Sequence, residues 1–334
     1  MTFTLASPRT LQYPDSRISA ARSAGAFRLG AIALVLGALS MTAACGGGGG
    51  GDSSGGTDAG STGATTSSVG TAAPGTSAMP TNVAYSCDFS TSLQDCGLGE
   101  HAKVPGRATL VTVGGVNAVR LHTEPGDNNV NGSGSHERND LILNQSRADG
   151  YEGKVHWWAH SVLFPDDYVD PPESTLSTWN FGLVADFHDT SDAGGQASFQ
   201  VMAMPRTAIS SDRATGLNFQ INSGNQFSPT QHTAYIGPVV RNVWYNFVYH
   251  VKWTSGPDGF FDAWVDGAQK MSYRGPTLYA GQGCYFKLAN YHSAFARPSS
   301  VIHARVVRGS TAGAVSAGSL EGIPHLRQAS RSGR

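Results

Sequence analysis

Short runs of aromatic and β-branched residues, each followed by turn-forming residues, constrain the fold of this chain more than any other feature. These runs cover residues 136–143, 155–164, 183–188, 197–204, 217–222, 244–253, 260–265, 285–292 and 301–307. Pro165 and Pro205 stop two of them, and Asp266-Gly267 follows another. Such composition and punctuation are typical of β-strands, and no stretch shows the 3.6-residue period of a helix of several turns. Many strands with turns at short spacing predict an all-β sandwich or jelly roll.

The two ends of the chain differ from this strand-rich middle. Residues 1–45 combine several Arg with an apolar run that is too short to span a bilayer, as in a signal peptide. This segment ends in Thr42-Ala43-Ala44-Cys45, which is similar to the cleavage box of bacterial lipoproteins, where Cys45 would be lipidated. Residues 46–81 are rich in Gly, Ser and Thr and predict a disordered linker, as residues 323–334 predict a disordered tail.

We therefore expect one β-domain, residues 82–322, in an exported protein. The lipidation signal favours an outer-membrane or cell-surface lipoprotein, which would touch the membrane only through its lipid. The alternative is a periplasmic or secreted protein in which Cys45 is removed or unused. We expect the domain to be a monomer.

Charge and cysteine content narrow the possible functions. The formal net charge is −1, so the chain has no basic field for nucleic acid. Cys87 and Cys96 are close in the sequence of an exported domain, which predicts a disulfide, whereas Cys284 has no obvious partner. No Cys/His spacing suggests zinc and no cofactor is expected. The acidic loop 165–170 is a candidate for structural calcium, although it lacks a fixed ligand spacing.

Side-chain alternation sorts the polar residues of several strands onto one face. In 285–292, Tyr285, Lys287 and Tyr291 share a face, and Phe286 points the other way into a core. Three other strands each place a set of polar residues on one of their faces. The sets are His136, Arg138 and Asp140 in 136–143, Asp186 and His188 in 183–188, and Asn218, Gln220 and Asn222 in 217–222. A sheet face lined by Arg, His, Lys, Tyr and amides suits a hydroxylated, carboxylated ligand. The alternative is a set of unrelated solvent-facing strands.

Three of these strands stand in the order found in the jelly-roll polysaccharide lyases. Arg138-Asn139-Asp140 resembles the Arg-x-Glu of alginate lyases, and Asp186-Phe187-His188 resembles their Gln-Ile/Val-His. Residues 285–291 resemble their Tyr-Phe-Lys-x-Gly-x-Tyr, and 244–267 is similar to the heparin lyase and glucuronan lyase branch. The resemblance covers most of 82–310. It implies a concanavalin-like β-jelly roll of two antiparallel sheets, and a lyase that cleaves a uronic-acid polysaccharide by β-elimination.

The resemblance also implies roles for single residues, because such a lyase must neutralise the uronate carboxylate, remove the C5 proton and protonate the oxygen leaving C4. Arg138 is the candidate neutraliser, with an ion pair to Asp140 or Glu137 as the alternative. His188 is the candidate base or carboxylate partner. Tyr291 is the candidate proton donor and an alternative candidate for the base, and Lys287 would favour its phenolate or bind a carboxylate. The candidate substrate-binding residues are Asp140, Asp186, Asn218, Gln220, Asn222 and Tyr285.

Three departures from the motifs bear on the expected activity. Asp140 replaces Glu, Ala289 replaces Gly, and Asp186 stands where the motif has Gln. An ionised Asp186 would repel a substrate carboxylate, so a loss of catalysis is the alternative to activity. The near-neutral balance favours an anionic uronate polymer such as glucuronan or alginate over heparin. The alternatives are a non-catalytic carbohydrate-binding lipoprotein, a structural surface lipoprotein, and a glycosidase, for which Asp262 and Asp266 come nearest to a carboxylate pair.

Overall fold

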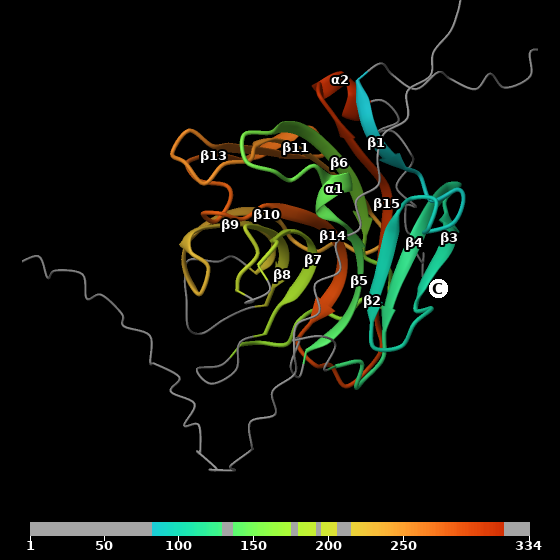
Figure 1. Cartoon of the computed structure of the whole chain (residues 1–334). Coiled ribbons are helices and arrows are strands. Elements are labelled where there is room, and N and C mark those ends of the chain that lie inside the picture. Colours follow the sequence, from blue (N-terminus) through green and yellow to red (C-terminus); the bar gives the residue numbers. More distant parts are fainter. Residues whose placement is uncertain (1–81, 129–135, 175–179, 192–194, 206–214, 317–334) are drawn as a thin grey trace, which may run out of the picture. The chain divides into compact units, whose positions relative to one another are not determined.

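The computed structural model describes residues 82–128, 136–174, 180–191, 195–205 and 215–316 (Figure 1). The predicted signal peptide 1–45 with Cys45, the linker 46–81 and the tail 323–334 lie outside these residues and stay predictions. Within the described ranges, no helix is long and apolar enough to cross a membrane.

Two antiparallel sheets contain most of the described residues. The strands are β1 (Val83–Cys87), β2 (Leu98–Ala102), β3 (Ala108–Val113), β4 (Val116–Thr123), β5 (Glu137–Leu143), β6 (Val155–Leu163), β7 (Gly182–Asp189), β8 (Phe199–Met204), β9 (Gly216–Asn225), β10 (Ser228–Gly237), β11 (Trp244–Lys252), β12 (Phe260–Val265), β13 (Ala268–Arg274), β14 (Cys284–His292) and β15 (Ser299–Gly309). Two short helices, α1 (Gln145–Ala148) and α2 (Ala312–Ser316), accompany them.

The strand order is that of a sandwich in which neighbours in sequence are often neighbours in space. One sheet runs β13-β12-β11-β6-β15-β4-β3, with β1 paired to β15, and the other runs β10-β9-β8-β7-β14-β5-β2 (Figure 1). The predicted fold class, an all-β jelly roll of two antiparallel sheets, is confirmed. The Asp266-Gly267 turn between β12 and β13 has positive φ at both residues, 49° and 75°, as a two-residue type I′ hairpin requires.

The inner faces of the sheets meet in an aromatic core. Phe286 of β14 packs against Phe187 of β7 and Trp158 of β6, with ring centroids 4.9 and 5.2 Å apart. Phe219 and Ile221 of β9 are also buried, as their alternation predicts. Burying each such side chain stabilises the fold by about 1.5–3 kcal/mol relative to leaving it exposed. The core therefore fixes which side of β7, β9 and β14 faces outward.

Polar groups on the inner face fasten β14 to the other sheet. Asn290 Nδ2 donates to the backbone carbonyls of Leu121 and Ser299 at 3.1 and 3.0 Å. His292 Nε2 lies 2.8 Å from Thr123 Oγ1, and burial lowers the pKa of His292 to about 4. His292 is therefore neutral near pH 7, and these bonds hold the strand whose outer side carries the predicted site.

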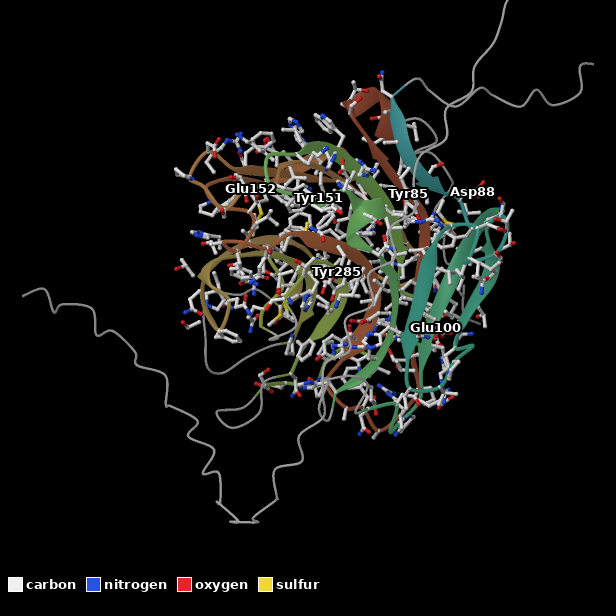
Figure 2. The ribbon with its side chains drawn as sticks, in the orientation of Figure 1. Tyr85, Asp88, Glu100, Tyr151, Glu152 and Tyr285 are labelled. Atoms are coloured by element: carbon white, nitrogen blue, oxygen red, sulfur yellow. A yellow bond between two sulfur atoms is a disulfide. The ribbon has the colours of Figure 1, made fainter. Side chains whose placement is uncertain are left out.

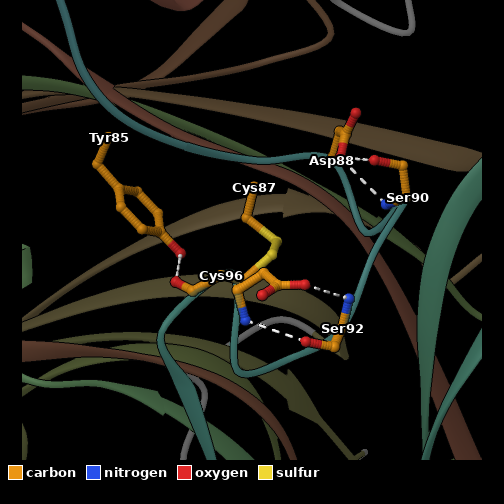
Figure 3. The surroundings of a disulfide bond; sticks show 7 residues. Tyr85, Cys87, Asp88, Ser90, Ser92 and Cys96 are labelled. Atoms are coloured by element: carbon orange, nitrogen blue, oxygen red, sulfur yellow. Dashed lines mark hydrogen bonds between the residues drawn. A yellow bond between two sulfur atoms is a disulfide. The ribbon is translucent and has the colours of Figure 1, made fainter.

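A disulfide joins Cys87 at the end of β1 to Cys96 just before β2 (Figure 3). The two Cα atoms are 5.3 Å apart, and the hydroxyl of Tyr85 donates to the carbonyl of Cys96 at 2.9 Å. Among the described residues Cys284 is the free cysteine, and it is buried beneath the outer face of β14.

Replacing both Cys87 and Cys96 by Ser is expected to lower the free energy of unfolding by about 2–3 kcal/mol, because the bridge restricts the unfolded chain. Urea unfolding of the wild type and the double variant measures the loss. A reducing agent should bring the wild type to the midpoint of the variant and leave the variant unchanged. Equal midpoints without reductant would contradict the prediction.

Candidate active site

The outer face of the seven-stranded sheet gathers ionisable side chains from β2, β5, β7 and β14. β14 lies between β5 and β7, and its outward side carries Tyr285, Lys287, Ala289 and Tyr291. Figure 2 shows Tyr285 on this strand, within the sheet of β2, β5 and β7. The inner-face bonds of Asn290 and His292 hold this row of side chains in place.

The strand register divides the predicted catalytic residues into two groups. Tyr285 pairs with His188 of β7, whereas Tyr291 pairs with Arg138 of β5. The two tyrosines are six positions apart in β14, and six residues of a strand span roughly 20 Å. The backbones of His188 and Tyr291 are therefore roughly 20 Å apart on the sheet.

The Tyr291 group consists of Tyr291, Arg138 and His136. The Arg138 guanidinium carbon lies 4.0 Å from the centroid of the Tyr291 ring, which is a cation–π contact. The Tyr291 hydroxyl lies 3.4 Å from His136 Nδ1, and Phe181 packs edge-on to the same ring. Tyr291 and Arg138 are both partly exposed. A cation, a phenol and an imidazole thus meet at one accessible end of β14.

The Tyr285 group consists of Tyr285 and His188. The two rings stack with centroids 5.3 Å apart. His188 Nδ1 lies 3.0 Å from the carbonyl oxygen of Asp189, which can only accept, so Nδ1 carries a proton and donates it. Burial raises the pKa of Tyr285, and the nearby Lys287 opposes that rise. The charge of Lys287 thus acts on Tyr285, whereas the sequence predicted that it would act on Tyr291.

Four alternating charges, which we call the charge chain, connect the two groups. Lys287 Nζ lies 3.0 Å from Asp186 Oδ2 and 3.9 Å from Asp140 Oδ2. Arg138 Nε lies 3.3 Å from Asp140 Oδ2. Burial alone would lower the pKa of Lys287, which is 3% exposed, but the carboxylates of Asp186 and Asp140 outweigh it and the pKa is raised. Lys287 therefore stays protonated, and the formal charges of the charge chain cancel.

Asp140 makes the charge chain sensitive to pH. Burial raises the pKa of Asp140 from 3.8 to about 6, against the opposing effect of Lys287 and Arg138. Between pH 4 and 6 the folded state holds a proton that the unfolded state releases. The stabilising contribution of this carboxyl group is therefore present below pH 4 and is lost as the pH rises through 6.

Replacing Asp140 by Asn is expected to remove this pH dependence. Between pH 4 and pH 7, the free energy of unfolding is expected to fall in the wild type by up to about 3 kcal/mol more than it changes in Asp140→Asn. Urea unfolding of both proteins at the two pH values measures the difference. Parallel changes in the two proteins would show that Asp140 does not titrate in this range.

Three residues that the sequence did not assign to the site lie in or beside it. His136 belongs to the Tyr291 group, and Gln200 of β8 pairs with Asp186. His101 of β2 pairs with Asp140, and burial together with the charges of Arg138 and Lys287 lowers its pKa to about 4. Both ring nitrogens of His101 are buried without a hydrogen bond to the described residues. β2 is short and polar, so its sequence gave no alternation that would have identified His101.

The predicted substrate-binding amides of β9 lie on the outer side of the sheet but are buried. Asn218, Gln220 and Asn222 are at most 3% exposed. Asn218 Nδ2 donates to the carbonyl of Gly216 at 3.0 Å, and Gln220 and Asn222 bond to each other. Gln200 on the neighbouring strand β8 accepts a hydrogen bond from Gln220 and is partly exposed.

The described residues contain no group of three or more His, Cys, Asp or Glu that could hold a metal ion. The carboxylates of the acidic loop 165–170 point to separate partners. Asp166 accepts from Asn242 at 2.7 Å, Asp167 pairs with Arg120, and Asp170 pairs with Arg241 at 2.7 Å. Structural calcium in this loop stays a prediction.

The family of the chain follows from its match to a family model. The model named polysaccharide lyase matches residues 91–307, which include every residue of the Tyr291 group, the Tyr285 group and the charge chain. The chain belongs to this family and is a polysaccharide lyase, as the sequence predicted. No curated protein sequence matches the chain.

Several solved structures are similar to this chain at low sequence identity. An endo-β-1,4-glucuronan lyase from the fungus Trichoderma reesei is 16% identical, with a TM-score of 0.48, over 64% of this chain and 92% of that one. The alginate lyase Aly36B is 10% identical, with a TM-score of 0.46, over 68% and 96%. The alginate lyase vAL-1 from Chlorella virus is 8% identical, with a TM-score of 0.42, over 64% and 91%. The assignment to the family rests on the family model.

Proposed function

We propose that this lyase cleaves an unsulfated uronate polysaccharide by β-elimination at the Tyr291 group. The observation that carries the proposal is the meeting of the Arg138 guanidinium, the Tyr291 phenol and the His136 imidazole at one partly exposed end of β14. These three groups match the three tasks of the reaction, which are carboxylate neutralisation, proton removal and protonation of the leaving oxygen.

Arg138 is the group that neutralises the substrate carboxylate. Its Nε faces Asp140, and its terminal nitrogens make no hydrogen bond to the described residues. A guanidinium offers five donors in a planar fork, so the terminal nitrogens remain able to grip a carboxylate with two bonds. Neutralising the carboxylate makes the proton on the adjacent C5 more acidic.

His136 and Tyr291 then divide the proton transfers. The imidazole of His136 removes the C5 proton, and the electron pair of that bond forms the C4=C5 double bond as the C4–O bond breaks. Tyr291 gives its proton to the leaving oxygen. The C5 proton now lies on Nε2 of the His136 imidazolium, whose Nδ1 proton passes to the Tyr291 phenolate across the 3.4 Å between Nδ1 and the phenol oxygen. Exchange of the Nε2 proton with water restores the starting tautomer of His136. Apo distances of this length are compatible with catalytic hydrogen bonds that shorten when substrate binds.

The charge chain bears on which polymer is bound. Its two cations are matched by Asp140 and Asp186, so the charge chain carries no excess positive charge for sulfate groups. A polymer with one carboxylate per sugar, such as glucuronan or alginate, needs one guanidinium at the cleaved residue. The Tyr285 group lies roughly 20 Å along β14 from Tyr291 and would contact another sugar of the same polymer.

An absorbance assay for the unsaturated uronate product tests the proposal. Purified protein is incubated with glucuronan, alginate and heparin in turn. Absorbance is expected to grow on glucuronan or alginate and not on heparin. Growth on heparin alone would contradict the substrate class. No growth on any of the three, with polymer still bound, would favour the carbohydrate-binding alternative.

A further inference from the structure

A short row of amides on the outer side of β8 and β9, which we call the amide row, fixes the orientation of Gln200. Asn222 Nδ2 donates to the backbone carbonyl of Ala197 at 2.6 Å. A carbonyl can only accept, so Asn222 must present its Oδ1 to Gln220. Gln220 Nε2 donates to that Oδ1 at 2.9 Å and to Gln200 Oε1 at 3.1 Å. The backbone carbonyl of Ala197 therefore sets the direction of every amide in the row.

Gln200 is consequently held with its carbonyl toward the row and its N–H groups outward. Its Oε1 accepts from Gln220 and, at 3.3 Å, from Asn222, which occupies both lone pairs. Its Nε2 makes no hydrogen bond to the described residues. Gln220 and Asn222 are 3% and 0% exposed, whereas Gln200 is partly exposed. The amide row thus presents two oriented donors at an accessible point of the outer face.

The position of Gln200 defines which part of a polymer it can reach. It pairs with Asp186, which pairs with Lys287, so it lies two strands away from β14 and level with Lys287. Tyr291 lies four positions further along β14, so the backbones of Gln200 and Tyr291 are roughly 15 Å apart by ordinary strand spacings. That separation places Gln200 beside a sugar other than the one that is cleaved.

The surroundings of Gln200 favour a neutral acceptor. Asp186, the charged residue that pairs with Gln200, is matched by Lys287 at 3.0 Å, so a substrate carboxylate would gain no net attraction from this pair. A sugar hydroxyl carries lone pairs that an amide N–H can reach without any charge on either side.

We propose that Gln200 is a specificity-determining residue whose Nε2 donates to a hydroxyl of a sugar distant from the cleaved bond. Gln220 and Asn222, for which the sequence predicted direct sugar contacts, are positioning residues that act through Gln200. The inference rests on the proposed function, because it assigns a distal subsite on the same outer face.

The variant Gln200→Glu tests the inference, because its carboxylate can still accept from Gln220 and Asn222 while the outward donors are lost. On long polymer, KM is expected to rise about tenfold with kcat within about twofold of wild type. On the shortest oligosaccharide that is still cleaved, kcat/KM is expected to stay within about twofold. Measurement at about 0.5 M salt screens the added charge from the Tyr291 group. Gln269→Glu, the same change at an exposed position of β13, is the control.

Gln220→Glu extends the test to the positioning residues. A carboxylate at 220 can only accept, so Gln200 would turn its N–H groups inward and its carbonyl outward. This variant is also expected to raise KM on polymer and to leave kcat unchanged. Unfolding midpoints verify that each variant is folded. If Gln220→Glu does not fold, the KM of Gln200→Glu alone tests the inference.

Two results would overturn the inference. One is a KM on polymer within about twofold of wild type in Gln200→Glu, and the other is an equal loss on the long and the short substrate. Either result leaves the proposed function intact, because the wild type is active in both. A wild type that is inactive on every polymer removes the proposed function and this inference together.

Discussion

Replacing Tyr291 by Phe is expected to lower kcat by about 10²- to 10⁴-fold, because the change removes the group that protonates the leaving oxygen. The ring that contacts the Arg138 guanidinium remains, so KM is expected to change little. The rate of formation of the unsaturated product, measured by absorbance, gives both constants.

Tyr285→Phe is the matched control, since it makes the same change on the same face of β14. Its phenol lies in the Tyr285 group, away from Arg138 and His136, and kcat is expected to stay within about tenfold of wild type. The opposite outcome, in which Tyr285→Phe is inactive and Tyr291→Phe is active, would move the reaction centre to His188.

Replacing Lys287 by Met is expected to lower the free energy of unfolding by about 3–5 kcal/mol, because it leaves buried carboxylates without their cation. Asp186 and Asp140 are 1% and 0% exposed, and no hydrogen bond to the described residues satisfies their carboxylate oxygens. Urea unfolding at pH 7 measures the loss. Lys270→Met, at an exposed position of β13, should change the free energy by less than about 0.5 kcal/mol.

A double variant separates this effect from a loss of packing. Combining Lys287→Met with Asp186→Asn removes one of the two buried carboxylates that have lost their cation. The double variant is therefore expected to recover part of the lost stability. A loss below about 1 kcal/mol in Lys287→Met would contradict the charge chain. That result would instead make Lys287 an accessible group of the kind the sequence predicted.

The fold could be predicted because strand alternation is a local property. In β9 and β14, residues that are two apart face the same way, and the burial of Phe219, Ile221 and Phe286 follows directly from that period. Strands with mixed or polar sequences were harder to identify. β10 is a largely exposed edge strand and β2 has five residues, so neither shows a clear apolar side.

The composition of the site could not be predicted fully, because register between strands depends on contacts that are distant in sequence. Alternation places His188 and Tyr291 on the same face but does not say that His188 pairs with Tyr285. It also gives no reason to group His136 with Tyr291 or Gln200 with Asp186. These groupings follow from the pairing of β14 with β5 and of β7 with β8.

The charge chain explains how this chain can carry Asp186 where the motif has Gln. The sequence predicted that an ionised Asp at this position would repel a substrate carboxylate. Lys287 Nζ lies 3.0 Å from that carboxylate and balances its charge, so the repulsion at the Tyr291 group is small. We therefore expect the proposed reaction to proceed with Asp at position 186.

A crystal structure of Tyr291→Phe with an oligosaccharide of the polymer that the wild type cleaves tests the central claim most directly. The predicted result is a uronate carboxylate at about 3 Å from the terminal nitrogens of Arg138, with its C5 proton facing His136. An oligosaccharide whose uronate carboxylate is held at Tyr285 and His188, with Arg138 uncontacted, would contradict the claim.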